Sequence, residues 1–370
     1  KYGGIYTAKC CEVVSDMKIE CLTTDGVGSN HSWSVTLADQ TSVIFTATTT
    51  SYAPPIIRDY MKVKVDVTMF NTQGGEEIKI IGRNFGPYTG TRGMQNFNSI
   101  SYGQDKGLDF ILNATEDCRM TNAHTEIQCT IATGAGTELK WIIYVSGQES
   151  VSPTTAYAPP TIISIGPPHL RKKLQQQGGD VIYISGTNFG PKGSPGPYLE
   201  KVSYGFKGSK YDITGGCSVS VDSVEITCTT SKGIGGHREN GHIWYVTIRG
   251  QRSAKNTAAN ATTSYLRPML SKLVADHGPT DAIKVIQGVA SPIKLTLSGE
   301  NMGYYSPLGS INQVWIVFNG VEYSPDFPRS APAGQNSTYG GVESLSFNMP
   351  VGFGIDRSVD LYIHSGDIED

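Results

Sequence analysis

The sequence lacks several features that would assign it to common functional classes. It has no apolar run near the ~20 residues of a membrane-spanning helix, no signal peptide, and no long stretch rich in helix-forming residues. Charged residues make up only 17% of the 370 residues, and the formal net charge is −3. Because phosphate binding needs clustered Lys and Arg, and the one basic cluster (171–173) lies in a polar segment, we expect no nucleic-acid partner.

Catalytic and ligand-binding motifs are missing as well. The glycine-bracketed stretch "GGDVIYISGTNFG" matches neither phosphate-binding pattern, and no acidic calcium loop is found. The histidines form no HExxH or other ligand pattern. They do not recur at matching repeat positions either: His31, His124, His169, His237, His242, His277 and His364. The sequence therefore predicts no catalytic residues, no metal site, no cofactor and no enzyme.

What the sequence does contain is typical of β-structure. It has 43 Gly and 19 Tyr, with abundant Thr, Ser, Val and Ile, which favours strands joined by many turns. Its length allows roughly two to four domains.

Seven cysteines indicate one disulfide per repeat. The differences 21 − 10, 129 − 118 and 228 − 217 all equal 11, unlike the two-residue gaps of metal sites. Four N-x-S/T sequons accompany them, at Asn30, Asn113, Asn260 and Asn336. Together these features predict an extracellular or cell-surface protein with covalent glycans.

The interval of 11 fits a hairpin clamped across its open end. Pairing Cys217 with Cys228 places Val219 opposite Ile226 and Val221 opposite Val224, with 222–223 as a two-residue turn. Pairing Cys118 with Cys129 repeats this scheme.

The first cysteine pair is less regular. We expect Cys10–Cys21, which keeps the interval but turns Glu12 inward. The alternative, Cys11–Cys21, would place Val13 opposite Ile19 after a one-residue change of register. On the expected pairing, Cys11 is free or bridges to another chain.

The strand motif recurs as "GGEEIKIIGRNFG" (74–86), "GGDVIYISGTNFG" (178–190) and "SPIKLTLSGENMG" (291–303). In the second copy, Gly186 and Gly190 are expected to supply turn conformations. A period near 100 residues predicts whole domains in tandem. They are the C-terminal half of a domain (1–53), two full domains (54–159 and 160–267), and a divergent domain without its last strand (268–370). The incomplete repeats at both ends favour a window cut from a longer chain.

The repeats meet at short joints that contain Tyr and Pro. Pro restricts the backbone and stiffens such joints, which predicts a semi-rigid rod. A Trp recurs at one strand position as well, at 33, 141 and 244, where we expect it in the core. The joint residues are Tyr52, Pro54, Pro55, Tyr157, Pro159, Pro160, Tyr265 and Pro268.

These motifs in this order resemble the IPT/TIG domain, an immunoglobulin-like fold of plexins, of the hepatocyte growth factor receptor and of large protist surface proteins. The motifs are the glycine-bracketed strand, "VSYG", the cysteine pair, the Trp strand and Tyr-Ala-Pro-Pro. The likeness covers residues 54–267, half a domain before them, and 268–370 more weakly. It implies an all-β chain of tandem β-sandwiches.

Two functions follow as expectations. The first is a non-catalytic structural glycoprotein, a repeat segment of a filament or mastigoneme-like surface appendage that contacts other copies or neighbouring surface glycoproteins. The alternative is the ectodomain of an adhesion or recognition receptor with IPT repeats. A secreted enzyme that uses these domains as spacers is a third reading, because one sandwich hosts many functions.

Overall fold

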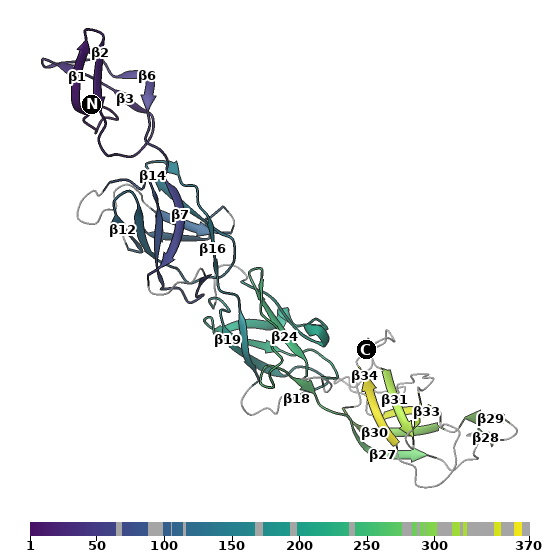
Figure 1. The fold of residues 1–370 in the computed structure, drawn as a ribbon. Coiled ribbons are helices and arrows are strands. Elements are labelled where there is room, and N and C mark those ends of the chain that lie inside the picture. The colour runs from purple at the N-terminus through teal and green to yellow at the C-terminus, as the bar shows by residue number, and fades with distance from the viewer. Residues whose placement is uncertain are drawn as a thin grey trace. The chain divides into compact units, whose positions relative to one another are not determined.

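The computed structural model describes residues 1–63, 69–87, 99–104, 106–113, 116–166, 173–192, 198–236, 241–275, 283–286, 289–292, 294–301, 313–318, 321–323, 344–348 and 359–364. Over these residues the regular elements are β-strands and two short 3-10 turns, Phe206–Gly208 and Thr214–Gly216. The strands form tandem immunoglobulin-like β-sandwiches (Figure 1), so the predicted all-β fold is confirmed. The chain divides into two compact units, Lys1–Pro159 with Arg249–Gln251, and Pro160–Ile248 with Arg252–Asp370.

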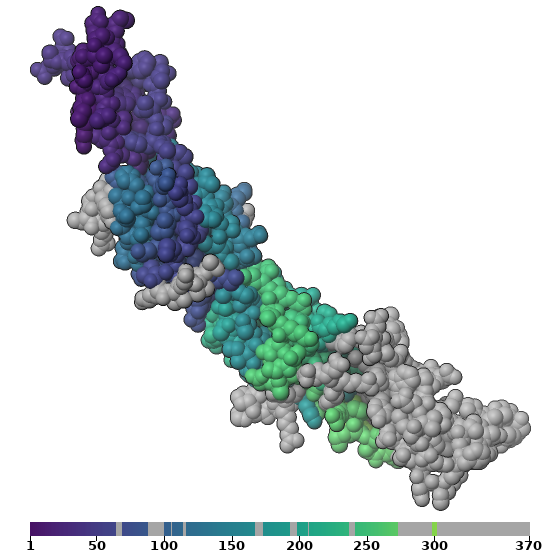
Figure 2. All heavy atoms as spheres, in the orientation of Figure 1, coloured from purple at the N-terminus to yellow at the C-terminus, as the bar shows by residue number. Residues whose placement is uncertain are grey.

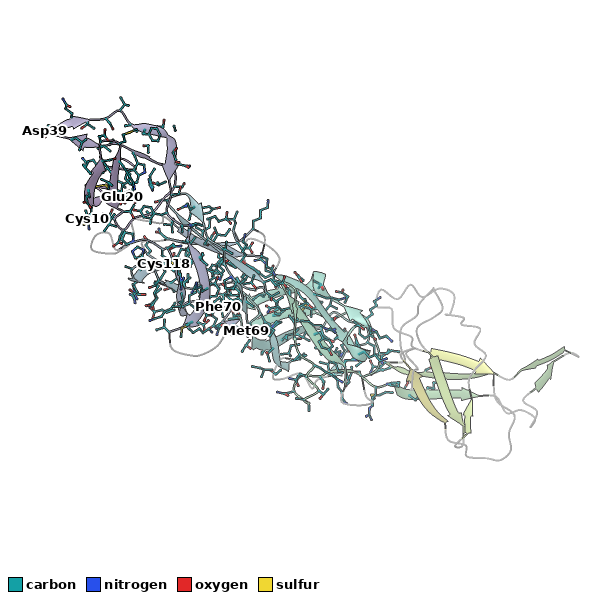
Figure 3. The ribbon with its side chains drawn as sticks, turned by 45° about the horizontal axis from the view of Figure 1, so that its top comes forward. Cys10, Glu20, Asp39, Met69, Phe70 and Cys118 are labelled. Carbon is teal, nitrogen blue, oxygen red and sulfur yellow. A yellow bond between two sulfur atoms is a disulfide. The ribbon has the colours of Figure 1, made fainter. Side chains whose placement is uncertain are left out.

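In the first unit, a sandwich follows Pro55. One sheet has the order β12-β13-β9-β7, and the other β11-β10-β14-β16-β8 with β15 on β14. The short strand β8, whose two residues are labelled in Figure 3, pairs in parallel with the last strand, β16. The strands are β7 (Ile56–Lys62), β8 (Met69–Phe70), β9 (Glu77–Arg83), β10 (Ser99–Gly103), β11 (Phe110–Asn113), β12 (Cys118–Asn122), β13 (Glu126–Thr130), β14 (Leu139–Val145), β15 (Gln148–Glu149) and β16 (Thr154–Tyr157).

The sandwich that follows Pro160 repeats this plan, with sheets β17-β19-β23-β22 and β21-β20-β24-β25 and a parallel pair β18-β26. Registers match between the two units: β10 pairs with β14, and β20 pairs with β24. The strands are β17 (Thr161–Ile165), β18 (Lys173–Leu174), β19 (Val181–Thr187), β20 (Leu199–Gly205), β21 (Tyr211–Asp212), β22 (Cys217–Val221), β23 (Glu225–Thr229), β24 (Ile243–Ile248), β25 (Gln251–Arg252) and β26 (Ser264–Tyr265).

The burial of strand β19 shows which side of the glycine-bracketed stretch faces the core. Ile182 and Ile184 are buried, whereas Val181 and Tyr183 are exposed, so the period-2 alternation separates core from solvent.

The glycines of this stretch have two different tasks. Gly190 (φ 77) and Asn188 (φ 61) form the turn after the strand. Gly186 does not adopt a turn conformation, which corrects the expectation. A Cβ at Gly186 would collide with the carbonyl oxygen of Thr161 and the ring of Phe189. This glycine is needed because β17 passes very close.

Both full sandwiches contain the predicted disulfide hairpin. Cys118 lies opposite Cys129, and Cys217 opposite Cys228, and each pair is bonded. These two predicted pairings are confirmed.

The turn of the second hairpin differs from the prediction. Val221 lies opposite Glu225 rather than Val224, after a register shift that follows Val219. The loop therefore has one residue more than expected, with Ser223 left-handed at φ 62. Val221 is 48% exposed instead of facing the core. A bulge beside a three-residue turn is a common hairpin solution.

The first 53 residues form three two-stranded pairs, β1-β2, β3-β6 and β4-β5. An isolated bridge joins Tyr2 to Trp33, at the position where β10 meets β14 in the following sandwich. The strands are β1 (Lys9–Ser15), β2 (Lys18–Leu22), β3 (His31–Trp33), β4 (Thr36–Leu37), β5 (Gln40–Thr41) and β6 (Phe45–Thr50).

The expected Cys10–Cys21 pair is wrong. The disulfide joins Cys11 to Cys21, and Cys10 is exposed with a free thiol. Strand β1 carries one extra residue here, because Val13 lies opposite Ile19 after a shift that follows residue 9. Cys10, at φ 47, occupies this bulge, near Glu20 of the partner strand (Figure 3). The register is therefore that of the alternative pairing, with Val13 opposite Ile19.

The described strands after residue 268 form the sheets β27-β30-β33 and β32-β31-β34 and the pair β28-β29. Strand β31 pairs with β34, just as β10 pairs with β14. The strands are β27 (Met269–Ala275), β28 (Ile283–Ile286), β29 (Val289–Pro292), β30 (Lys294–Glu300), β31 (Gln313–Phe318), β32 (Val321–Tyr323), β33 (Ser344–Asn348) and β34 (Val359–His364).

Candidate functional site: a tyrosine pair before each joint

The joint tyrosines lie inside the sandwich that they end. Tyr157 and Tyr265 are completely buried, and Tyr52 is partly buried. The rings of Tyr157 and Tyr265 therefore pack in the core of the sandwich that they end. The β-strand that leaves each sandwich is thus anchored by its last aromatic side chain.

Each of these tyrosines forms a hydroxyl pair with a second tyrosine from the strand position of "VSYG". The Oη–Oη distances are 2.6, 2.8 and 2.5 Å for Tyr2–Tyr52, Tyr102–Tyr157 and Tyr204–Tyr265. Sequence reasoning identified one member of each pair but missed the other. The recurring "YG" was the available signal.

The pair is completed by the loop that follows the disulfide hairpin. In the sandwich of residues 54–159, the Tyr157 hydroxyl donates to the carbonyl of Ala132 (2.7 Å), and the Ala132 amide donates to Tyr102 Oη (3.0 Å). Because Tyr157 has only one hydroxyl proton, Tyr102 must be the donor within the pair. The three groups form a closed ring of hydrogen bonds.

The same ring recurs in the other two repeats. Its loop residues, Thr24, Ala132 and Ser231, each lie three positions after the second cysteine of a disulfide (21, 129 and 228). The first and third tyrosine pairs bond both backbone groups of Thr24 and Ser231 respectively. The exit strand is thereby tied to the cross-linked hairpin.

Burial keeps the hydroxyl groups of the third tyrosine pair, Tyr204 and Tyr265, protonated. Burial, reinforced by the neighbouring Tyr204, raises the pKa of Tyr265 far above its usual range. Burial also raises the pKa of Tyr204. Both therefore stay protonated at neutral pH and act as hydrogen-bonding groups.

The recurring tryptophans stack on the first tyrosine of each pair. Ring centroids are 4.5, 4.3 and 4.1 Å apart for Trp33, Trp141 and Trp244. Each indole N–H donates to a threonine Oγ1, at 2.9, 2.8 and 3.0 Å. Their predicted place in the core is confirmed for Trp141 and Trp244, which are buried.

Two histidines do occupy matching repeat positions, which corrects the sequence reading. His31 and His242 each lie two residues before a recurring Trp and pack edge-on against three tyrosine rings. Leu139 occupies this position in the sandwich of residues 54–159. The spacing of each histidine from the recurring Trp is the signal in the sequence.

The carbonyl groups of the joint tyrosines make a different contact. Gln148 Nε2 donates to the carbonyl of Tyr52 at 2.9 Å, and Asn84 Nδ2 donates to that of Pro54 at 2.9 Å. Gln251, which belongs to the first unit, donates to the carbonyl of Tyr157 at 2.8 Å. Figure 2 draws residues 1–53 in purple shades and the sandwich that follows them in blue to teal.

A polar cavity of about 300 Å³ lies at the first joint, and Asp25, Tyr52 and His124 are its ionisable lining residues. Across the described ranges, no group of three His, Cys, Asp or Glu side chains could hold a metal ion. Over the same ranges, no helix is long and apolar enough to span a membrane.

Three of the predicted sequons can be placed. Asn30, Asn113 and Asn260 are exposed, and Asn336 lies outside the described residues. The Asn260 amide also donates from Nδ2 to the carbonyl of Ile163 at 3.0 Å.

No family model and no curated protein matches the chain. Similar solved structures include a surface glycan-binding protein from Prevotella bryantii, with 14% identity, TM-score 0.31, and 71% of this chain and 58% of that chain covered. Another is the full extracellular region of plexin A4, with 13% identity, TM-score 0.24, and 85% and 23% covered. The I9–I11 tandem of titin has 8% identity and TM-score 0.22, with 79% and 88% covered.

The chain spans 57% of the length of a structure with xylogluco-oligosaccharide that it also resembles. At these identities and TM-scores, the comparisons assign neither a family nor a ligand. The chain is a tandem array of immunoglobulin-like sandwiches with a repeated tyrosine pair.

Proposed function

We propose that this chain is a segment of a non-catalytic extracellular structural glycoprotein, a filament or mastigoneme-like surface appendage. It consists of a half domain (1–53), two IPT/TIG-like domains (54–159 and 160–267) and a divergent domain (268–370). Its partners are other copies or neighbouring surface glycoproteins, together with covalent glycans. Three disulfides favour an oxidising compartment.

The observation that carries this proposal is the double use of the joint tyrosine. In Tyr52, the hydroxyl donates a hydrogen bond to the carbonyl of Thr24 in the loop beside a disulfide-linked hairpin, and the backbone carbonyl accepts one from Gln148 Nε2. A tensile load on the exit strand therefore passes into a covalently cross-linked element. That is a requirement of a load-bearing array and not of a catalytic site.

Electron microscopy of the native material tests the proposal. Regular filaments decorated at a constant interval by an antibody against residues 54–159 are the expected result. Labelled membranes without filaments would replace the proposal with the alternative, an adhesion or recognition receptor. Non-reducing peptide mapping tests for a disulfide between subunits, which would use Cys10, the free cysteine.

The joint can be tested separately in the full chain. Gln148→Ala removes the hydrogen bond to Tyr52, so amide exchange in 145–149 should accelerate roughly 2- to 10-fold. Gln73→Ala, at an exposed position in the same sandwich, is the control and should change nothing. Equal exchange in both variants would show that the hydrogen bond from Gln148 to Tyr52 does not stabilise the joint.

A further inference from the structure

The outer face of the sheet β17-β19-β23-β22 differs in chemistry from the matching face of the preceding sandwich. Across the sheet, Tyr183 lies opposite Thr227, and Thr227 opposite Ser218. This row carries no charge, and Tyr183 is 38% exposed.

The matching row of the preceding sandwich is Lys79, Gln128 and Arg119. Its basic side chains pair with acidic neighbours on the same face: Lys79 lies 3.0 Å from Glu126, and Arg119 lies 4.0 Å from Glu77. One sandwich therefore presents an ion-paired surface. The other presents a phenol ring beside hydroxyl groups, with Glu225, which accepts a hydrogen bond from the Ser220 hydroxyl, at the position that matches Glu126.

The edge of the sheet β17-β19-β23-β22 holds a glycosylation sequon. Asn260 lies along β17, where its Nδ2 donates to the carbonyl of Ile163 (3.0 Å) and its own carbonyl accepts the amide of Ile165 (2.8 Å). Ile163 is itself 51% exposed. A sugar on Asn260 would start at the border of this face.

We propose that an N-linked glycan on Asn260 lies across this face, with its sugar rings against Tyr183 and its hydroxyl groups bonded to Thr227 and Ser218. The inference rests on the proposed function, since it requires a glycosylated extracellular chain. In the attachment, Nδ2 bonds to the anomeric carbon of an oligosaccharide diphosphate, the diphosphate carrier leaves, and one Nδ2 proton is lost. The remaining Nδ2 proton can still form the hydrogen bond to the carbonyl of Ile163.

The chemistry of the face suits a carbohydrate. A phenol ring offers an apolar surface with a polar tip, and each Ser or Thr hydroxyl both donates and accepts hydrogen bonds, as sugar hydroxyls do. Because the glycan is tethered at the edge, its effective concentration is of millimolar order, so weak contacts suffice. A second copy has no such tether and needs about 800 Å² of buried surface per partner.

The test measures nitration of Tyr183 by tetranitromethane, followed by peptide mass spectrometry of the secreted full chain. The control protein carries Thr262→Ala, which destroys the sequon but keeps the Asn260 amide; Asn260→Gln serves as a second variant. We expect Tyr183 to react at least 3-fold more slowly in the glycosylated chain than in either variant. Tyr144, 46% exposed in the other sandwich, should react equally in all three.

The outcomes separate this inference from the proposed function. If Asn260 carries a glycan but Tyr183 reacts equally in all proteins, the inference is wrong and the structural glycoprotein stands. If Asn30, Asn113 and Asn260 are all bare in native material, the proposed function fails with it. If protection of Tyr183 persists in Thr262→Ala and rises with protein concentration, a second copy is the occupant and the inference is overturned.

A reverse experiment changes the face instead of the glycan. Tyr183→Lys introduces the residue found at the matching position of the preceding sandwich. Exoglycosidases should then trim the Asn260 glycan several-fold faster, with the Asn30 glycan as the internal control. An unchanged rate would contradict the proposed contact.

Discussion

Removing one tyrosine hydroxyl from the sandwich of residues 54–159 should show how much the closed ring of hydrogen bonds stabilises it. In Tyr157→Phe, the carbonyl of Ala132 loses a donor at 2.7 Å and the hydroxyl of Tyr102 loses an acceptor at 2.8 Å. Both tyrosine side chains are completely buried, so water cannot replace the lost partner without a rearrangement. The expected loss is about 1–3 kcal/mol of local stability.

Native-state hydrogen exchange is the suitable assay because the chain has several domains, each of which can open separately. The predicted loss corresponds to roughly 5- to 150-fold faster exchange in residues 131–135 and 154–157. The other sandwiches should keep their rates. Trp141, which stacks on Tyr102, offers a second, fluorescent readout.

Two further variants make this prediction refutable. Tyr144→Phe removes an exposed hydroxyl that donates to Glu149 and should leave exchange unchanged. Tyr102→Phe, alone and combined with Tyr157→Phe, measures the coupling of the pair. If Tyr157→Phe costs no more than Tyr144→Phe, or if the pair shows no coupling, the closed ring does not stabilise the sandwich.

Three other changes have defined outcomes. Gly186→Ala should lower the free energy of unfolding in urea by about 1–3 kcal/mol, because the new methyl group meets the Thr161 carbonyl. The control Gly215→Ala, with open space at Cβ, should change it by no more than about 0.5 kcal/mol. Equal effects would contradict the close approach of β17 to Gly186. Iodoacetamide without reductant should label Cys10 alone, and a labelled Cys11 in peptide maps would restore the other pairing. Because burial raises the folded-state pKa of Tyr265, its contribution is complete below about pH 10 and is lost as pH rises further. The near-ultraviolet circular dichroism signal of the folded chain should therefore decrease on the alkaline side, and Tyr265→Phe should reduce this decrease. An identical alkaline decrease in Tyr265→Phe would refute this assignment.

Much of the fold was predictable because it depends on local pattern. The alternation in β19 and the interval between paired cysteines specify strands and hairpins within a few residues of each other. Repetition then multiplied each weak signal, so the Trp positions could be assigned to the core before any contact was known.

The two errors have different causes. For Cys10 and Cys11, the sequence offered both registers, and the structure adopts the one with a bulge in β1 and Val13 opposite Ile19. The need for Gly186 comes from β17, more than 20 residues earlier in the chain. This close approach is not visible in the residues next to Gly186.

The sequence alone therefore determined that this is a tandem β-protein with a disulfide hairpin in each of its first three repeats. Local alternation, turn residues and spacing are sufficient for that. Only the tertiary structure joined Tyr102, Tyr157 and Ala132, because these residues lie on different elements and meet only after the two sheets pack. The same is true of Asn260 at the edge of β17. Packing brings together groups that are far apart in the chain, and those meetings carry the proposals about function.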